Sequence, residues 1–339
     1  MEDKLDGVLS NCRGTNFKSK LQRRKPIPLW GDNMVRVLIA DPVAASAQKK
    51  IEDAGLEVVV RNKDKDGPVE KQIKGFDCIV VRSATKVTKE VIDASDKLKL
   101  IVRAGVGLDN VDQEAAKAKG IKVMNTPEGP SVSVAEMVFA LMLGLARAVP
   151  QADSYMKAQR WEKKSLAGFE LWHKTMGIVG LGRIGTEVAK RATAFGMNVL
   201  AYDAIDIKKQ CKELGIKAVS LEDLLANSDF ITLHVPLIPQ TKGMIGEKEL
   251  KRMKKNAYLI NTARGGIIDD AALLKALDEG TIAGAGIDVY EPEPPADWKL
   301  AKHPKVVATP HLASSTNEAQ ERLGDLAAEK VVKEFKSRK

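Results

Sequence analysis

The chain has 339 residues, 44% of them hydrophobic, and a formal net charge of +9 at pH 7. This length is sufficient for two ordinary domains, and no apolar run is long and uncharged enough to span a bilayer. Lysines and arginines are spread among acids rather than clustered. We therefore interpret the excess charge as a solvated surface that mildly attracts anionic ligands, and we expect neither a nucleic-acid nor a membrane partner.

Cysteine usage indicates a reducing compartment. Cys12, Cys78 and Cys211 are scattered and odd in number, which argues against a disulfide framework or a metal site. The first residues also lack the apolar segment of a secretory signal. We therefore expect a cytoplasmic protein without a metal.

Residues 1–33 differ from the rest of the chain, because they are polar and contain the basic run Arg23–Lys25 followed by two prolines. We predict a disordered N-terminal extension, with Met34 as the natural start. A transit peptide fits less well, since positions 2, 3 and 6 are acidic and such peptides are poor in acids.

From Met34 the sequence alternates between strand and helix patterns, which predicts a parallel sheet covered on both faces. A helix is expected over 45–55, closed by Gly55. The segment 133–149 is apolar on nearly every face, so it must form a buried helix, in the core or, as we favour in part, at a dimer interface. The strands of this first unit are expected at 34–41, 56–61, 77–82, 98–105 and 121–127.

The second unit begins at Thr175. The strands of this second unit are expected at 175–179, 198–202, 229–237, 257–266, 283–290 and 305–313. A last helix over Asn317–Lys336 returns to the first unit. We predict two doubly wound α/β domains with a cleft between them. The first comprises residues 34–132 and 315–339, and the second, inserted into it, comprises 133–314.

A glycine fingerprint opens the second unit. Gly180, Gly182 and Gly185 follow a short apolar strand and begin a helix, in the G-x-G-x-x-G spacing of a Rossmann dinucleotide site. The free N–H groups of the helix then face the pyrophosphate. Asp203 ends the next strand, where an acid binds the ribose hydroxyls and favours NAD over NADP.

Chemistry on a nicotinamide needs a base, a cation for the substrate and a group that orients the base. In open α/β sheets such groups lie at the carboxyl ends of strands. His173 and His303 do not lie at the carboxyl end of a predicted strand, and we expect both at the surface. His234 and His311 each end a predicted strand. We assign His311 as the base and expect His234 to line the cofactor site.

Arg264 follows a predicted strand and precedes two glycines, so its guanidinium has room to bind a carboxylate. The alternative is a salt bridge at a helix start, to Asp269 or Asp270.

An acid beside His311 would hold its tautomer. Glu293 and Glu291 both lie in the proline-rich loop after the preceding strand, and position alone leaves both open. Asp288, at the end of that strand, is expected to meet the nicotinamide carboxamide.

The first unit offers two more candidate groups. The backbone N–H groups of Gly105 and Gly107, at a strand end, are suited to a carboxylate. Arg82, Ser83 and Thr85 end another strand, and an arginine with hydroxyls suits a phosphate. The alternative for these three is a cap on the following helix.

The chain resembles the D-isomer-specific 2-hydroxyacid dehydrogenases from Met34 to about Lys336. The shared runs are RAGVGLDNVD, SVAEMVFALMLGLAR, GIVGLGRIG, HVPL, NTARGG, DVYEPEPP and PHLASSTNEAQ. The resemblance implies that Arg264 binds the substrate carboxylate, that His311 is the acid/base and that Glu293, rather than Glu291, is its partner. With the glycine loop, the expected NAD contacts are Val106, Gly180, Gly182, Arg183, Ile184, Gly185, Asp203, His234, Val235, Pro236, Ala263, Asp288, His311 and Ala313.

The ending HLASSTNEAQ and Arg82 resemble the branch of the family that oxidises 3-phospho-D-glycerate to 3-phosphohydroxypyruvate, and Arg147 is a weaker candidate for the same phosphate. The family usually has glycine at the position of Ala313 and often has glycine at the position of His173. The C-terminal serine-sensing domain of longer members is not expected. The alternatives are another D-2-hydroxyacid dehydrogenase, acting on glyoxylate, hydroxypyruvate or D-lactate, and an NAD-sensing corepressor-like protein. A homodimer or higher homo-oligomer is expected.

Overall fold

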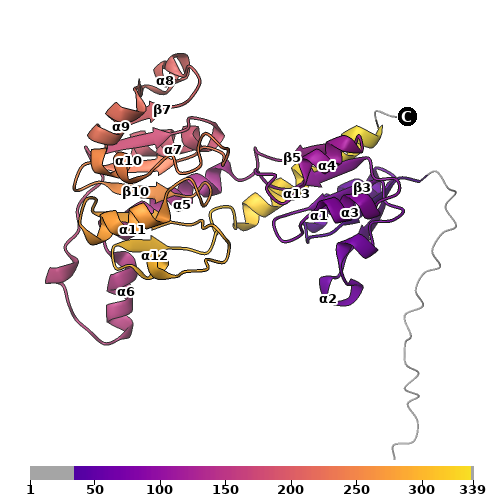
Figure 1. Ribbon diagram of the computed structural model, residues 1–339, viewed down its shortest axis with the longest axis horizontal. Coiled ribbons are helices and arrows are strands. Elements are labelled where there is room, and N and C mark those ends of the chain that lie inside the picture. The colour runs from indigo at the N-terminus through magenta and orange to yellow at the C-terminus, as the bar shows by residue number, and fades with distance from the viewer. Residues whose placement is uncertain (1–33, 337–339) are drawn as a thin grey trace, which may run out of the picture. The chain divides into compact units, whose positions relative to one another are not determined.

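The computed structural model describes residues 34–336 (Figure 1). The predicted extension over residues 1–33, including Cys12, lies outside the described residues. The described part contains two parallel sheets, each with helices on both faces. This arrangement confirms the predicted α/β fold class.

The first sheet has five strands in the order β2-β1-β3-β4-β5, which is the flavodoxin-like order. Every residue of β3 is buried, because alternate side chains point to opposite faces and both faces are covered. The strands are β1 (Arg36–Ile39), β2 (Glu57–Val60), β3 (Cys78–Val81), β4 (Leu100–Arg103) and β5 (Lys122–Asn125).

One face of this sheet is covered by α1 (Ala45–Asp53) and the last helix, α13 (Asn317–Lys336), which pack against each other. The last helix therefore returns to the first sheet, as predicted. Gly55 has a φ of +81° and follows the C-cap residue Ala54 of α1, consistent with its expected role in closing this helix. The other elements are α2 (Lys63–Asp66), η1 (Val69–Lys71), α3 (Lys89–Ala94) and α4 (Gln113–Ala118), of which η1, α3 and α4 cover the opposite face.

The second sheet has seven strands in the order β12-β11-β10-β9-β6-β7-β8. The order turns back at β6, from which the chain winds first to one side and then to the other, as in a Rossmann sheet. The strands are β6 (Thr175–Val179), β7 (Asn198–Tyr202), β8 (Lys217–Ala218), β9 (Phe230–Leu233), β10 (Tyr258–Asn261), β11 (Gly284–Ile287) and β12 (Val306–Ala308).

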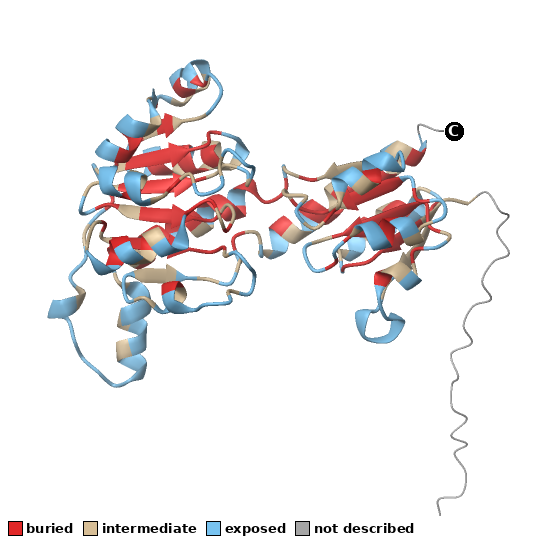
Figure 2. Cartoon of the chain, in the orientation of Figure 1, coloured by how far each residue is buried: buried red, intermediate tan, exposed pale blue. Residues whose placement is uncertain are grey.

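Two apolar layers enclose the second sheet, and Figure 2 shows its inner strands as mostly buried. One layer is formed by α5 (Ser131–Ala146), α7 (Arg183–Ala194) and α8 (Lys208–Leu214). The opposite layer is formed by α9 (Leu221–Asn227), α10 (Glu247–Arg252), α11 (Asp270–Asp278) and α12 (Lys299–Lys302).

The apolar helix expected over 133–149 is α5, which is shorter at its C-terminus than predicted. It ends at Ala146 because Ala148 adopts a left-handed backbone, with a φ of +49°, and α6 (Val149–Lys157) begins in a new direction. The chain's own α7 and second sheet bury most of α5. Within residues 34–336 no single helix is long and apolar enough to cross a membrane; only the bent pair of α5 and α6, taken together, reaches that length and apolarity. A role of α5 in a dimer interface stays a prediction.

Phe230 provides a test of the second core. Its side chain is fully buried, and its ring lies 5.2 Å from that of Tyr258 and 6.0 Å from that of Phe169. We expect Phe230→Ala to lower the free energy of unfolding by about 3–5 kcal/mol, measured by urea denaturation. Phe195 stacks on Phe139 at 5.0 Å but is 43% exposed, so Phe195→Ala should cost only about 1 kcal/mol. Equal losses would contradict this assignment of the core.

Candidate active site

The predicted site residues of the second sheet all follow its strands at their carboxyl ends. Because the strands are parallel, these ends share one edge of the sheet. The residues are Gly180 after β6, Asp203 after β7, His234 after β9, Arg264 after β10, Asp288 after β11 and His311 after β12.

The glycine loop has the geometry of a dinucleotide site. Gly180 has a φ of +94°, and a Cβ there would lie 2.7 Å from the His234 carbonyl oxygen. A Cβ on Gly185 would lie 2.2 Å from the Gly180 carbonyl oxygen, so the helix packs closely on the loop. A Cβ on Gly182 would meet nothing within 4 Å. No side chain caps the first N–H groups of α7, so open space and free donors coincide where a pyrophosphate binds.

Asp203 lies against the same loop. One of its carboxylate oxygens accepts a hydrogen bond from the Leu181 N–H at 2.8 Å, and the other accepts from the Ile205 N–H at 3.4 Å. The acid at the end of β7 is thereby held beside the glycine turn, as a ribose-binding acid must be.

His234 lies against the glycine loop and is partly buried. Its Nε2 pairs with the Thr232 hydroxyl at 3.0 Å, while its Nδ1 is buried and has no hydrogen-bond partner within residues 34–336. Burial lowers the pKa of His234 to about 3, so the ring is neutral at pH 7. The hydroxyl of Thr262, which follows β10, is also buried without a partner among the described residues.

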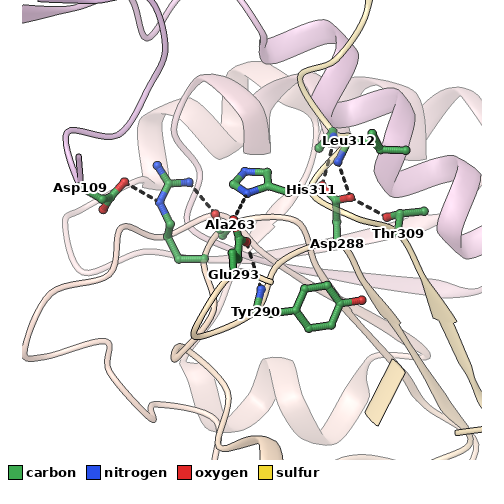
Figure 3. Close-up of polar contacts among 10 residues, drawn as sticks. Asp109, Ala263, Asp288, Tyr290, Glu293, Thr309, His311 and Leu312 are labelled. Carbon is green, nitrogen blue, oxygen red and sulfur yellow. Dashed lines mark hydrogen bonds and ion pairs between the residues drawn. The ribbon is translucent and has the colours of Figure 1, made fainter. Parts of the chain in front are cut away.

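The structure brings His311 and Glu293 together, with 2.7 Å between Nδ1 and the carboxylate oxygen Oε2 (Figure 3). A carboxylate only accepts, so Nδ1 carries the proton and Nε2 of the neutral ring is left as an acceptor. The other oxygen of Glu293 accepts from the Tyr290 N–H at 3.2 Å. Glu291 instead lies 3.9 Å from the ammonium of Lys242.

Asp288 holds the turn that carries His311. Its fully buried carboxylate accepts hydrogen bonds from the Thr309 hydroxyl at 2.5 Å, the Leu312 N–H at 2.7 Å and the Ala313 N–H at 2.9 Å (Figure 3). The backbone N–H of His311 donates to the Asp288 carbonyl at 2.8 Å. These contacts fix His311 in the left-handed region, with a φ of +53°. The contact of Asp288 with a nicotinamide carboxamide stays a prediction.

Arg264 is paired with an acid that the sequence analysis missed. Its Nε donates to the Asp109 carboxylate at 3.0 Å, and its Nη1 donates to the Ala263 carbonyl at 2.6 Å. A Cβ on Gly107 would lie 1.9 Å from Nη2 of Arg264, so a side chain at position 107 would displace the guanidinium. Neither alternative partner is used, because Asp269 caps α11 by accepting from two backbone N–H groups, and the ion pair of Arg264 is with Asp109.

Arg103, at the end of β4, is a second cation that the sequence analysis did not consider. Burial and the charge of Arg264 lower the pKa of Arg103 to about 10, and Asp109 opposes this shift. Its guanidinium donates to the Gly107 carbonyl, and its Nε is buried without a partner among the described residues. The signal in the sequence was its position at a strand end, two residues before Gly105, but at this strand end we considered only the glycines.

The structure supports only part of the predicted phosphate-binding site. Within residues 34–336 the Arg82 side chain makes a single hydrogen bond, to the Pro42 carbonyl at 3.3 Å, and Ser83 is exposed. Arg82 also lines a cavity of about 360 Å³ that is shared with residues 42–44 and the first turns of α13. Thr85 is 4% exposed, and its hydroxyl donates to Asp41 at 2.7 Å. It therefore anchors the turn instead of facing a ligand.

Three further expectations need correction or comment. The Gly105 N–H already donates to the Thr126 hydroxyl at 2.8 Å, so it does not bind a carboxylate. The His303 side chain is only 9% exposed and lies 3.4 Å from Asp278, so it is not a surface histidine; His173 is exposed, as expected. Arg147 is exposed and directly follows the last residue of α5.

The remaining predicted cofactor residues lie around the glycine loop or the adjoining strand ends. Arg183 begins α7, and its guanidinium is 3.6 Å from the Glu128 carboxylate. The carbonyl of Val106 accepts from the Asn125 amide, and Ala313 is 3% exposed. His173 has a φ of +58°, a conformation that glycine adopts without steric cost, which explains the glycine expected there. Also placed in this region are Ile184, Val235, Pro236 and Ala263.

Comparison with known proteins agrees with this geometry. The profile described as D-isomer specific 2-hydroxyacid dehydrogenase, NAD binding domain, matches residues 139–313. D-3-phosphoglycerate dehydrogenase of Methanocaldococcus jannaschii is 48% identical over 301 residues, covering 88% of this chain and 57% of its own length. The chain thus spans little more than half the length of the curated relatives it matches.

Two solved structures are similar over nearly their whole length. The TT0316 protein from Thermus thermophilus has a TM-score of 0.79 and 36% identity, covering 89% of this chain and 97% of its own. D-lactate dehydrogenase from Aquifex aeolicus, complexed with NAD and lactic acid, has a TM-score of 0.76 and 34% identity, covering 89% and 95%. Fold and site define a protein with a Rossmann dinucleotide-binding sheet inserted between the parts of a flavodoxin-like one. The chain belongs to the D-isomer specific 2-hydroxyacid dehydrogenases.

His234, whose ring atom Nδ1 is buried, predicts that the stability of the fold is sensitive to acid. Its pKa is about 3 in the folded protein and about 6.5 when unfolded. Between these values the unfolded chain binds a proton that the folded chain does not, so the free energy of unfolding falls as pH falls, by up to about 1.4 kcal/mol per pH unit from this group. Above about pH 6.5 its contribution is constant.

We expect His234→Gln to flatten the pH dependence of the free energy of unfolding between pH 6 and 4, measured by urea denaturation. His173→Asn is the matched control, because His173 is exposed and asparagine tolerates its left-handed backbone. Parallel curves for His234→Gln and the unmodified protein would show that this histidine is not the source.

Proposed function

We propose that the protein catalyses the NAD-dependent oxidation of 3-phospho-D-glycerate to 3-phosphohydroxypyruvate, with NADH and a proton as the other products. The observation that carries the proposal is the 2.7 Å pair of His311 and Glu293, on the sheet edge that also bears Arg264. The curated relatives named D-3-phosphoglycerate dehydrogenase, at 44–48% identity, support this choice of substrate.

The residues present fit NAD. Gly182 borders open space, the N-terminus of α7 has free N–H groups, and Asp203 is held beside the loop. These groups would hold the pyrophosphate and the ribose, and a 2′-phosphate would meet the carboxylate of Asp203. When bound, NAD accepts the hydride that leaves C2 of the substrate. We propose residues 133–314 as the cofactor domain, and 34–132 with 315–339 as the substrate domain.

Arg264 would hold the substrate carboxylate. Of its donors, Nη2 makes no hydrogen bond within the described residues, and Gly107 leaves space beside it. A planar guanidinium binds a carboxylate with two parallel hydrogen bonds. Because Asp109 already pairs with Nε, the guanidinium is oriented before the substrate arrives.

His311 would take the proton of the C2 hydroxyl on Nε2, the ring atom that its pairing leaves as acceptor. Glu293, on Nδ1, keeps that tautomer and stabilises the imidazolium as it forms. The same pair returns the proton in the reverse reaction. The turn held by Asp288 keeps the ring in place, which is how a rigid backbone contributes to catalysis.

Arg82 would bind the phosphate at the far end of the substrate. Among the described residues its guanidinium makes one long hydrogen bond, which leaves most of its donors available, and the cavity of about 360 Å³ beside it has space for a ligand. Ser83 is exposed next to it and would add a hydroxyl. Glu321 also lines this cavity, so the phosphate would bind on the Arg82 side.

A second copy of the chain is the proposed protein partner. No residue of α6 is buried, as Figure 2 shows, and both α6 and the residues just after it carry large apolar side chains at the surface. Val149 is 54%, Met156 57% and Trp161 82% exposed. An exposed apolar group of this kind is typical of an interface.

We also propose a cytoplasmic location, because Cys78 and Cys211 are buried free thiols.

The first test of the function is NADH formation at alkaline pH with 3-phosphoglycerate, D-glycerate or D-lactate as substrate. Preference for 3-phosphoglycerate supports the proposal. Activity on the unphosphorylated acids alone would favour the related reductases. Without activity in either direction, a nucleotide-binding role would be the better interpretation.

The base is tested by His311→Gln. We expect kcat to fall by about 10²–10⁴-fold, because general-base catalysis of the hydroxyl is lost, while the Kd for NAD in a fluorescence titration stays within about twofold. His173→Gln, at an exposed histidine, should leave kcat unchanged. Normal turnover of His311→Gln would rule out His311 as the base.

The phosphate residue is tested by Arg82→Met. Loss of a charge-assisted contact, about 1.5–3 kcal/mol, should raise KM for 3-phosphoglycerate by about 10–150-fold and leave KM for D-glycerate nearly unchanged. The same substitution at Arg147 is the comparison. If Arg147→Met, and not Arg82→Met, shows this pattern, the assignment moves to Arg147.

A further inference from the structure

The loop after β4 connects the two arginines to which the proposed function assigns the ends of the substrate. Its neighbouring residues Asp109 and Asn110 contact different parts of the site. Asp109 accepts from Arg264 Nε at 3.0 Å, and the side-chain amide of Asn110 donates to the carbonyl oxygens of Arg82 and Thr85, both at 2.6 Å. One dipeptide thus links Arg264 to the turn that carries Arg82.

The Asn110 contact requires an amide. Both hydrogens of its Nδ2 are donated to carbonyl oxygens, which only accept. Its Oδ1 is buried without a partner among the described residues, so a flipped amide would place an oxygen against two carbonyl oxygens. The backbone adds to the link, because the Val87 N–H donates to the Asn110 carbonyl at 2.7 Å.

The Arg82 turn is held from its other side by Asp41. This buried carboxylate accepts from the N–H groups of Arg82 at 2.7 Å and Thr85 at 3.0 Å, and from the Thr85 hydroxyl at 2.7 Å. Lys63 lies 2.7 Å from it and balances its charge. The backbone of the turn is therefore clamped between Asp41 and Asn110, while among the described residues the Arg82 guanidinium has a hydrogen bond only to the Pro42 carbonyl.

We propose that Asn110 is a positioning residue that sets the separation between Arg82 and Arg264, and so selects hydroxy acids with a second anionic group at the far end. The inference rests on the proposed function. A carboxylate held at Arg264 presents C2 to His311 whatever the length of the acid. Only a substrate whose far end carries an anion reaches Arg82, so only that substrate depends on the spacing.

The experiment measures kcat and KM of the full chain for 3-phosphoglycerate and D-glycerate. Asn110→Asp keeps the shape but replaces both donors with an acceptor. We expect KM for 3-phosphoglycerate to rise about tenfold, as for the loss of two hydrogen bonds, with both kcat values and KM for D-glycerate within about twofold. Asn110→Ser, which keeps one donor and no charge, should give a smaller change of the same kind.

Asn227→Asp is the matched control, because the Asn227 amide also donates to a backbone carbonyl, that of Asp223 in α9, far along the chain from the site. It should change neither KM. In a double-mutant cycle, Asn110→Asp should add little to Arg82→Met, because the phosphate contact is already lost. Additive effects, or equal losses for both substrates, would indicate a merely structural asparagine and overturn the inference.

The wild-type assay separates this inference from the proposed function. If wild type does not prefer 3-phosphoglycerate over D-glycerate, both fail. If wild type shows the preference and Asn110→Asp, folded by circular dichroism, retains it in full, the proposed function stands and only the role of Asn110 is overturned.

Discussion

The buried carboxylate of Asp288 holds the turn that carries His311, on which the chemistry proposed for this protein depends. A left-handed backbone at a residue other than glycine costs about 1–2 kcal/mol, and His311 has this conformation. Three hydrogen bonds to the carboxylate and one to the Asp288 carbonyl offset that cost, since bonds to a charged group contribute about 1.5–3 kcal/mol each. His311 is thereby presented to Glu293 with its Nε2 free to accept a proton.

The rest of the site is also held in place by close packing and by ion pairs. Glycines occur where another backbone or a guanidinium comes too close for a Cβ, as at Gly185 against Gly180 and at Gly107 against Arg264. Charges are likewise paired before any ligand arrives, as for Arg264 with Asp109 and Asp41 with Lys63. A site organised in this way needs little rearrangement to bind a substrate, which is the basis of preorganised catalysis.

Much of the fold followed from local pattern. Strand and helix periods, the glycine spacing and the acid after the second strand predicted two parallel sheets and a Rossmann fingerprint, because these depend on neighbours within a few residues. The carboxyl-end rule also selected His234 and His311 correctly as strand-end residues. It did not separate Glu293 from Glu291, since both lie in one loop and only the path of that loop decides which reaches His311.

The sequence by itself determined the order of the elements, the dinucleotide loop and the set of polar residues at one sheet edge. Only the tertiary structure decided their partners. Arg264 pairs with Asp109, 155 residues away, instead of the nearer Asp269. Thr85 is buried against Asp41 where a phosphate ligand was predicted, and the His303 side chain is mostly covered where a surface histidine was predicted. The contacts of Arg103 and Asn110 with the site were likewise visible only in the tertiary structure. Such contacts arise when strands distant in sequence are placed side by side, so spacing along the chain carries no record of them.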